Sequence, residues 1–130
     1  MRIAFITYEY PTEIGLGGIG TYTQQVAQAL VSKGIEVAVF CGSKKSNTVY
    51  KDGGVLIYTI KCEDPFSFKT NVVSPFLSAH EKRPYNLIES PEIHGNAEEI
   101  KRVLPDLHMV VRLQAPNYLV ESLKKTYTPQ

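Results

Sequence analysis

Hydrophobic residues change their spacing twice within the first forty positions. Residues 2–8 form a largely apolar run of strand length, as expected for a strand buried on both faces of a parallel sheet. From Thr21 the spacing becomes that of a helix, which Lys33 and Gly34 end as a cationic last turn and a glycine cap. Residues 36–41 again have the pattern of a buried strand. The order strand, loop, helix, strand predicts a crossover between two parallel strands, and hence an α/β protein.

The predicted helix has one apolar face and one polar face. The apolar face consists of Tyr22, Val26, Ala29 and Leu30. Thr21 and Gln24 have the spacing of a capping box at the first turn. We therefore expect the helix to begin near Thr21 and to pack on the sheet through its apolar face.

The rest of the chain predicts further strands and helices. Residues 48–50 and 55–60 flank the turn residues 51–54, KDGG, which is a strong hairpin signal. The later elements are expected to be a short helix at 74–81, a strand at 86–89, a helix at 95–103, a strand at 108–113 and a last helix from 117 or 118 to 126. The predicted fold class is α/β: a Rossmann-like three-layer sandwich with a mainly parallel sheet and an antiparallel hairpin ornament, in a single domain over residues 1–130.

The charge balance and the cysteine content exclude several classes of protein. The chain has 14 Lys and Arg residues against 13 Asp and Glu residues, so its net charge of +1 gives no field to steer nucleic acid. No apolar run approaches the roughly 20 residues of a membrane span, and polar residues at 7–9 end the first run too early for a signal peptide. Cys41 and Cys62 are expected to be free thiols of a reducing compartment. We therefore expect a cytoplasmic protein that binds no nucleic acid and has no transmembrane segment.

The loop after the first predicted strand, residues 9–20, ends in glycines directly before the helix. In open α/β sheets ligands collect at the carboxyl ends of the strands, and the unpaired N–H groups at a helix start favour an anion. Gly17, Gly18, Ile19 and Gly20 form a segment whose backbone can approach a phosphate closely. This glycine segment is therefore the candidate phosphate site.

The same loop leaves a second interpretation open. Gly15, Gly17 and Gly20 satisfy the G-x-G-x-x-G pattern of dinucleotide-binding domains. The first of these glycines lies several residues beyond the strand, and no acidic residue follows the second strand to hold a ribose. Lys44 and Lys45 could instead contact a 2′-phosphate. The NADP-binding domain of an oxidoreductase is therefore an alternative.

Two later loops also gather polar side chains. Ser90, Glu92 and His94 follow a predicted strand, where they suit hydrogen bonding to a polyol or acid–base chemistry. Alternatively, Ser90 or Asn96 caps the next helix and Glu92 complements its dipole. These residues match no metal-ligand spacing, so no metal site is expected. Arg112, near the end of the last predicted strand, is expected to pair with a carboxylate or with an anionic ligand.

Several segments, in the same order along nearly the whole chain, resemble the N-terminal domain of GT-B glycosyltransferases, particularly the retaining, nucleotide-sugar-dependent family 4. The resemblance rests on residues 2–7 (RIAFIT) with 10–11 (YP), 17–22 (GGIGTY) with 30–39, 86–92 (NLIESPE) with 95–97 (GNA), and 110–113 (VVRL) with 115–116 (AP). It implies a glycosyltransferase of hexosyltransferase type, which transfers a sugar from a nucleotide-sugar donor to a carbohydrate or lipid-linked acceptor.

The resemblance also implies roles for particular residues. It implies donor-phosphate contacts at Gly17, Gly18, Ile19 and Gly20, and acceptor contacts at Tyr10, Glu92 and His94. Gln114 stands where the family commonly has a histidine that faces the transferred sugar. Glutamine can donate and accept hydrogen bonds but cannot take up a proton. Beyond the nucleotide-sugar substrate no cofactor is expected.

In the family, most donor contacts lie in a second, C-terminal Rossmann domain. The resemblance therefore implies that such a domain acts with this chain in cis or in trans, and that the chain is inactive alone. It also allows a peripheral position at the cytoplasmic face of a membrane. A non-catalytic assembly module, whose surface contacts another chain, is the third interpretation.

Overall fold

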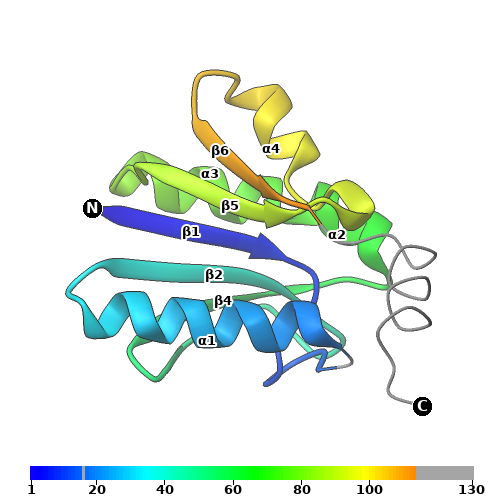
Figure 1. Cartoon of the computed structure of the whole chain (residues 1–130). Coiled ribbons are helices and arrows are strands. Elements are labelled where there is room, and N and C mark those ends of the chain that lie inside the picture. Colours follow the sequence, from blue (N-terminus) through cyan, green and yellow to red (C-terminus); the bar gives the residue numbers. More distant parts are fainter. Residues whose placement is uncertain (16, 114–130) are drawn as a thin grey trace, which may run out of the picture.

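The computed structural model, which describes residues 1–15 and 17–113, contains a six-stranded sheet with helices on both faces (Figure 1). In chain order the elements are β1 (Arg2–Thr7), α1 (Gly18–Ser32), β2 (Glu36–Ser43), β3 (Val49–Asp52), β4 (Val55–Lys61), α2 (Pro65–Asn71), α3 (Val73–Lys82), β5 (Leu87–Pro91), the short 3-10 helix η1 (Ile93–Gly95), α4 (Glu98–Val103) and β6 (His108–Arg112). The predicted α/β class is confirmed. The last predicted helix lies outside the described residues.

Neighbouring strands are parallel except for one pair. The strand order is β3-β4-β2-β1-β5-β6, and only β3 and β4 are antiparallel. Gly53 and Gly54 join these two strands with φ of 56° and 85°, as a two-residue type I′ turn requires. The Rossmann-like sandwich with its hairpin is therefore confirmed. Because β4 is also a parallel neighbour of β2, the hairpin is continuous with the sheet rather than an addition beside it.

Side chains of β1 alternate between two cores. Ala4 and Ile6 belong to the core under α2, α3 and α4, whereas Ile3 and Phe5 belong to the core under α1. Successive side chains of a strand point to opposite faces of the sheet. A strand that is covered on both faces is therefore apolar at nearly every position, which explains why the sequence predicted β1 so clearly.

The buried face of α1 agrees only in part with the predicted one. Val26 and Leu30 pack against the core as predicted, whereas Tyr22 and Ala29 are exposed. The residues that α1 buries fully are Gly20, Thr23 and Ala27. Gln24 and Gln28 donate instead to Oδ2 of Asp52, at 2.9 and 3.4 Å, so the polar side of the helix is turned toward β3. This polar contact explains the rotation of the helix relative to its apolar pattern.

The connection between β4 and β5 contains two helices where the sequence predicted one. The helix expected at 74–81 is present as α3, but α2 was missed. Oδ1 of Asp64 accepts the backbone N–H of Ser67 at 2.8 Å, while Ser67 Oγ accepts that of Asp64 at 3.1 Å. Pro65 occupies the first helical position, and Phe68 is fully buried beneath the helix. The capping box and the proline together determine where α2 begins.

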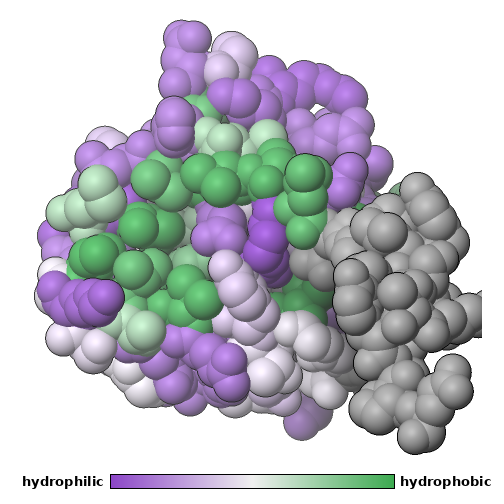
Figure 2. Space-filling model, in the orientation of Figure 1, coloured by the Kyte–Doolittle hydropathy of each residue, from purple (hydrophilic) through white to green (hydrophobic). Residues whose placement is uncertain are grey.

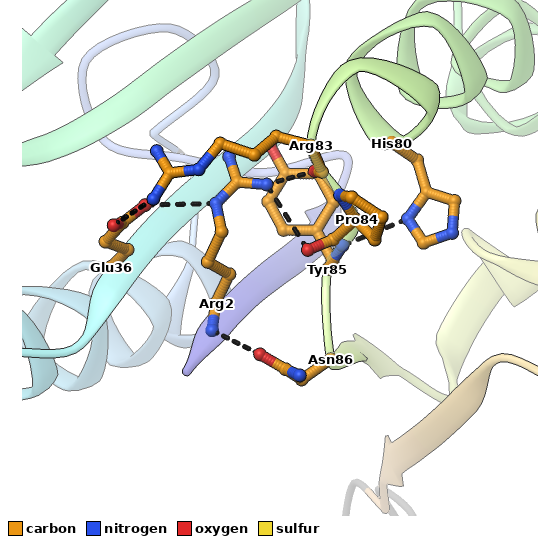
Figure 3. A network of polar contacts seen from close by, with 7 residues as sticks. All are labelled: Arg2, Glu36, His80, Arg83, Pro84, Tyr85 and Asn86. Atoms are coloured by element: carbon orange, nitrogen blue, oxygen red, sulfur yellow. Dashed lines mark hydrogen bonds and ion pairs between the residues drawn. The ribbon is translucent and has the colours of Figure 1, made fainter.

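A polar network joins the strands at their amino-terminal ends (Figure 3). Arg2 Nε lies 3.0 Å from Oε2 of Glu36, and Oε1 of Glu36 lies 2.5 Å from Nη2 of Arg83. The guanidinium of Arg2 also donates to the Arg83 carbonyl and lies 4.4 Å from the ring centre of Tyr85. The backbone N–H of Arg2 donates to Asn86 at 2.6 Å. β1, β2 and the chain that enters β5 are thereby held together at the edge opposite the carboxyl ends.

The near face of Figure 1 is only partly covered by helix. There α1 packs on β2 and β4. Met109 of β6 packs against the core under α2, α3 and α4, so the next residue, Val110, which is 43% exposed, points to the α1 side of the sheet. Figure 2 shows an apolar area, in green, on this same side of the molecule above α1.

Cys41 and Cys62 are free and buried, which confirms the predicted thiols. Burial raises the pKa of both, so they stay protonated and act as small apolar core residues.

Candidate functional site

A pocket lies where the carboxyl ends of β1 and β5 meet the starts of α1 and α2. Its volume is about 190 Å³. Residues from all these segments line it, among them Tyr8, Glu9, Ile19, Pro65, His94 and Asn96. We call it the β1–β5 pocket. Open α/β sheets bind their ligands at this edge, outside the carboxyl ends of the strands.

α1 begins within the predicted glycine segment, at Gly18 rather than near Thr21. Gly17 is the N-cap and makes no side-chain cap. Thr21 Oγ1 donates to the carbonyl oxygen of Gly17 at 3.4 Å, so the predicted capping box is wrong because Thr21 already lies inside the first turn. A helix start without a side-chain cap leaves its N–H groups available to an anion. Ile19, in the same turn, lines the β1–β5 pocket.

Gly18 and Gly20 differ in the space around them. A side chain at Gly20 would meet the backbone nitrogen and Cα of Tyr10 at 3.2 Å, whereas one at Gly18 would meet nothing within 4 Å. Gly20 therefore allows the first turn of α1 to lie directly on the loop after β1. Gly18 leaves open space in front of that turn.

Glu9 is a charged residue beside this helix start. Its two carboxylate oxygens lie 3.6 Å from the position that a Cβ atom at residue 17 would occupy. Glu9 also lines the β1–β5 pocket. A carboxylate is favourable near the positive end of a helix, but it repels a phosphate that approaches the same place. Glu9 thus provides a hydrogen-bond acceptor between the glycine segment and the pocket.

Tyr10, which the resemblance gave as an acceptor contact, lies in the core. Its side chain is fully buried, and its hydroxyl donates to Oδ2 of Asp52 at 2.7 Å. Burial and the Asp52 carboxylate raise the pKa of Tyr10, so the phenol remains protonated. Its backbone forms a β-bridge with Ile14 that folds the loop back on itself. The structure therefore corrects the prediction: Tyr10 shapes the loop and does not line the pocket.

The helix expected at 95–103 begins only at Glu98, as α4. His94 and Gly95 have φ of 64° and 54°, and these left-handed residues interrupt the helical backbone. As a result the ring of His94 lies beside the β1–β5 pocket, with its centre 6.4 Å from that of Phe66 on α2 and the two planes at 66°.

Neither Ser90 nor Asn96 caps α4, which has no side-chain cap. Ser90 Oγ donates to the carbonyl oxygen of Ile6 at 2.9 Å, and Asn96 Oδ1 accepts the backbone N–H of Tyr8 at 2.9 Å. Both side chains therefore tie the loop after β5 to β1. The Nδ2 atom of Asn96 is buried and has no hydrogen-bond partner in the part of the chain that the structure describes.

Glu92 lines a different and larger cavity. This cavity of about 500 Å³ lies between α4 and β6, where Met109 and Val111 contribute apolar surface. Its lining contains no residue of the glycine segment, and His94 is likewise absent from it. We therefore take the smaller β1–β5 pocket as the candidate site, because the glycine segment, His94 and Asn96 meet there.

The other candidates from the sequence are placed as follows. Arg112 Nη1 lies 3.0 Å from Oε1 of Glu89, which confirms the expected carboxylate partner, and its guanidinium lies 4.1 Å from the ring centre of Tyr22. Lys44 donates through Nζ to the backbone carbonyl of Glu63. Gln114 lies outside the described residues.

Sequence reasoning missed Glu9, Phe66 and Asn96 as parts of the site. Phe66 belongs to α2, and the Asp64–Ser67 capping spacing could have indicated that helix. Asn96 was predicted as an alternative helix cap and belongs to the 95–97 segment of the resemblance, but neither assigned it a role in the site. Its bond to Tyr8 joins positions 88 residues apart, which no local pattern indicates.

Comparisons with solved structures show that the fold is similar to that of one glycosyltransferase. No family model and no curated protein matches the chain. Among solved structures it is similar to sucrose-phosphate synthase from Thermosynechococcus elongatus, a GT-B glycosyltransferase, with a TM-score of 0.66 and 15% identity over 99% of this chain and 36% of that one. Another structure of that enzyme gives a TM-score of 0.62 and 14% identity over 96% of this chain and 70% of the other. The chain thus has a Rossmann-like fold of the GT-B kind and spans 36% of the length of the first structure.

The described residues contain neither a membrane-spanning helix nor a cluster of metal ligands. No helix in residues 1–15 and 17–113 is long and apolar enough to cross a membrane. The same residues include no group of three or more His, Cys, Asp or Glu side chains that could hold a metal ion.

Proposed function

We propose that this chain is the N-terminal, acceptor-side domain of a GT-B glycosyltransferase resembling family 4. The proposal rests on the position of Ile19, which belongs to the glycine segment at the start of α1 and also lines the β1–β5 pocket. A donor diphosphate at the helix start and an acceptor in the pocket would be neighbours, as transfer between them requires. The similarity of the fold to that of a GT-B enzyme supports the same assignment.

The nucleotide-sugar donor would place its diphosphate against the N–H groups around Gly18 and Ile19. The open space at Gly18 supports this placement, and the absence of a side-chain cap leaves those groups free to bind an oxygen. As the bond to the sugar breaks, the helix start would stabilise the charge that develops on the departing diphosphate. The remaining donor contacts would come from a C-terminal GT-B domain in cis or in trans.

The carbohydrate or lipid-linked acceptor would bind in the β1–β5 pocket beside His94. Glu92 would contribute only at the neighbouring cavity, and Gln114 would face the transferred sugar, as the resemblance implies. We propose that the chain is inactive alone and acts in the cytoplasm or at the cytoplasmic face of a membrane. Because most donor contacts would lie in the C-terminal domain, a nucleoside diphosphate is expected to bind this chain weakly or not at all in calorimetry.

The test is sugar transfer by the chain together with a donor-binding C-terminal GT-B domain, fused to it or added separately. Release of nucleoside diphosphate from a panel of nucleotide sugars, with monosaccharide and lipid-linked acceptors, is expected only when both parts are present. Gly18→Glu should abolish release, because it places a carboxylate in the open space at the helix start without a steric clash. Gln25→Glu, on the exposed side of the same helix, is the matched control.

The alternatives give different results. Saturable NADPH binding that Lys44→Glu abolishes would favour the oxidoreductase domain. A stable complex with a partner chain in analytical ultracentrifugation, without any sugar transfer, would favour the assembly module. A micromolar dissociation constant for a nucleoside diphosphate with the chain alone would contradict the proposed division of donor contacts between two domains.

A further inference from the structure

The β1–β5 pocket has a carboxylate but no cationic side chain of lysine or arginine. Glu9 lines it, and no lining residue among those described is lysine or arginine. Lys44 Nζ donates to the Glu63 carbonyl and lies 5.9 Å from the ring centre of Tyr8. Lys69 Nζ lies 3.8 Å from the Glu98 carboxylate and 5.9 Å from the ring centre of Phe66. Arg112, the register partner of pocket-lining Pro91, pairs with Glu89 through Nη1, while its Nε and Nη2 have no partner among the described residues. Sites for phosphate or carboxylate groups normally use arginine or lysine. The lining therefore disfavours an anionic occupant.

Asn96 gives this pocket an unused hydrogen-bond donor. The residue is 2% exposed and lines the pocket. Its Oδ1 is engaged by the N–H of Tyr8 at 2.9 Å, which fixes the orientation of the amide, but its Nδ2 has no partner among the described residues. A buried amide nitrogen without a partner is unfavourable, because it has lost its bonds to water. A bound oxygen that accepts from Nδ2 would remove this cost.

The rim of the pocket is aromatic and apolar. Phe66, the residue after pocket-lining Pro65, is 66% exposed, and its ring meets that of His94 edge to face. Ile93 also lines the pocket and is 44% exposed. Exposed aromatic rings next to a few oriented polar groups are typical of small-molecule sites rather than of plain surface.

We propose that the β1–β5 pocket binds one uncharged sugar ring of the acceptor, with Asn96 as hydrogen-bond donor, Glu9 as hydrogen-bond acceptor and Phe66 as the apolar platform. This inference rests on the proposed acceptor role and adds the class of acceptor. A sugar hydroxyl both donates and accepts, so it can use Glu9 and Asn96 at once, while the C–H face of the ring packs on Phe66. An ionised phosphate could accept from Asn96 Nδ2, but it has no proton to donate to Glu9, whose carboxylate repels it. The volume of about 190 Å³ limits the occupant to roughly one ring.

The test is a titration of the full chain with glucose, mannose, galactose and N-acetylglucosamine, and in parallel with their 6-phosphates, followed by heteronuclear NMR. The uncharged sugar that binds best should shift the side-chain amide signals of Asn96 and the backbone amide of Tyr8 in a saturable manner. Asn96→Asp keeps the oxygen that accepts from Tyr8 but removes the donor, and should weaken binding by about tenfold. Asn71→Asp, on the exposed surface of α2, is the matched control and should bind as the parent chain does.

Phe66→Ala is a second variant, and it should fold normally because the side chain of Phe66 is largely exposed. It should weaken sugar binding by about threefold to tenfold. Tighter binding of a 6-phosphate than of its parent sugar would overturn this inference and leave the acceptor-side role intact. Saturable shifts in which Asn96→Asp and Asn71→Asp bind alike would also overturn it, as would the absence of saturable shifts with every sugar. Binding of NADPH at these amides in place of any sugar would contradict the proposed function itself.

Discussion

The hydroxyl of Tyr10 donates to Oδ2 of Asp52 at 2.7 Å, and the same oxygen accepts from Nε2 of Gln24 at 2.9 Å. One carboxylate at the end of β3 therefore joins the loop after β1 to α1. The glycine segment lies between Tyr10 and Gln24 in the sequence, so both of its ends are held by the same group. This contact explains how a glycine-rich segment keeps a defined position beside the pocket.

Tyr10→Phe is expected to lower the free energy of unfolding by about 1.5–3 kcal/mol, the range for a hydrogen bond to a charged group. The ring that fills the core is retained, so the loss isolates the hydroxyl. Urea unfolding at neutral pH measures it.

Tyr22→Phe is the control, because that tyrosine is 43% exposed on the same helix–loop unit. It should change the free energy of unfolding by less than about 0.5 kcal/mol. Equal losses for the two substitutions would contradict the importance of the Tyr10–Asp52 bond.

Gly20→Ala is expected to destabilise the protein by about 1–3 kcal/mol, because its side chain would lie 3.2 Å from the backbone of Tyr10 and force the helix start away from the loop. Gly18→Ala adds the same methyl group in open space and should be neutral or stabilising by up to about 1 kcal/mol. Thermal unfolding of the two variants gives the comparison. A larger loss for Gly18→Ala than for Gly20→Ala would show that the helix start is not packed as described.

The strands could be predicted because their burial leaves a strong local pattern. Ile3, Phe5 and Ile6 are apolar since both faces of β1 are covered, and Gly53 and Gly54 have the backbone freedom that the hairpin turn needs. Such features depend on neighbouring residues alone.

The candidate site was harder to predict because long-range polar contacts determine it. Asp52 turns Gln24 toward the sheet, against the apolar pattern of α1, and Asn96 contacts Tyr8 rather than capping α4. Tyr10 matched a family motif, but it is fully buried and its hydroxyl is bonded to Asp52, 42 positions away. Contacts between residues far apart in the sequence produce no periodic pattern of apolar and polar residues, so the sequence does not reveal them.

The stability of the protein is expected to fall in acid partly through Glu36. The neighbouring Arg83 and Arg2 hold the pKa of its carboxyl group below the ordinary 4.5. A lowered pKa in the folded state stabilises the fold above the ordinary value, and this contribution disappears as the pH falls through the lowered value. The unfolding midpoint in urea should therefore differ most between the parent chain and Glu36→Gln near neutral pH, and the two should converge below about pH 4.

Salt and a second substitution check this interpretation. Because the pairs of Glu36 are exposed, about 0.5 M salt should reduce the difference at neutral pH. Glu81→Gln, on the exposed surface of α3, is the matched removal of a carboxylate without these arginines. A gap between the parent chain and Glu36→Gln that persists unchanged in acid would rule out this charge effect.

Glu9 is expected to oppose the binding of free phosphate groups at the start of α1. Its carboxylate lies close to Gly17, so Glu9→Gln removes a negative charge while keeping the shape of the side chain. Calorimetry with a nucleoside diphosphate at low ionic strength should show binding that is stronger by about threefold to tenfold, corresponding to roughly 1 kcal/mol of relieved repulsion. The gain should shrink as salt is added, because screening weakens the repulsion.

Glu13→Gln is the control for that experiment, since Glu13 lies in the same loop but its carboxylate accepts from the hydroxyl of Tyr50 at 2.9 Å. It should leave the affinity for the diphosphate unchanged. If Glu9→Gln and Glu13→Gln strengthen binding equally, the effect comes from net charge and the diphosphate is not bound at the glycine segment. If only Glu9→Gln strengthens diphosphate binding, and it also weakens the binding of an uncharged sugar, then the Glu9 carboxylate distinguishes the two ligands. It would accept a hydrogen bond from the acceptor sugar and would repel the diphosphate until a second domain supplies cationic side chains to bind it.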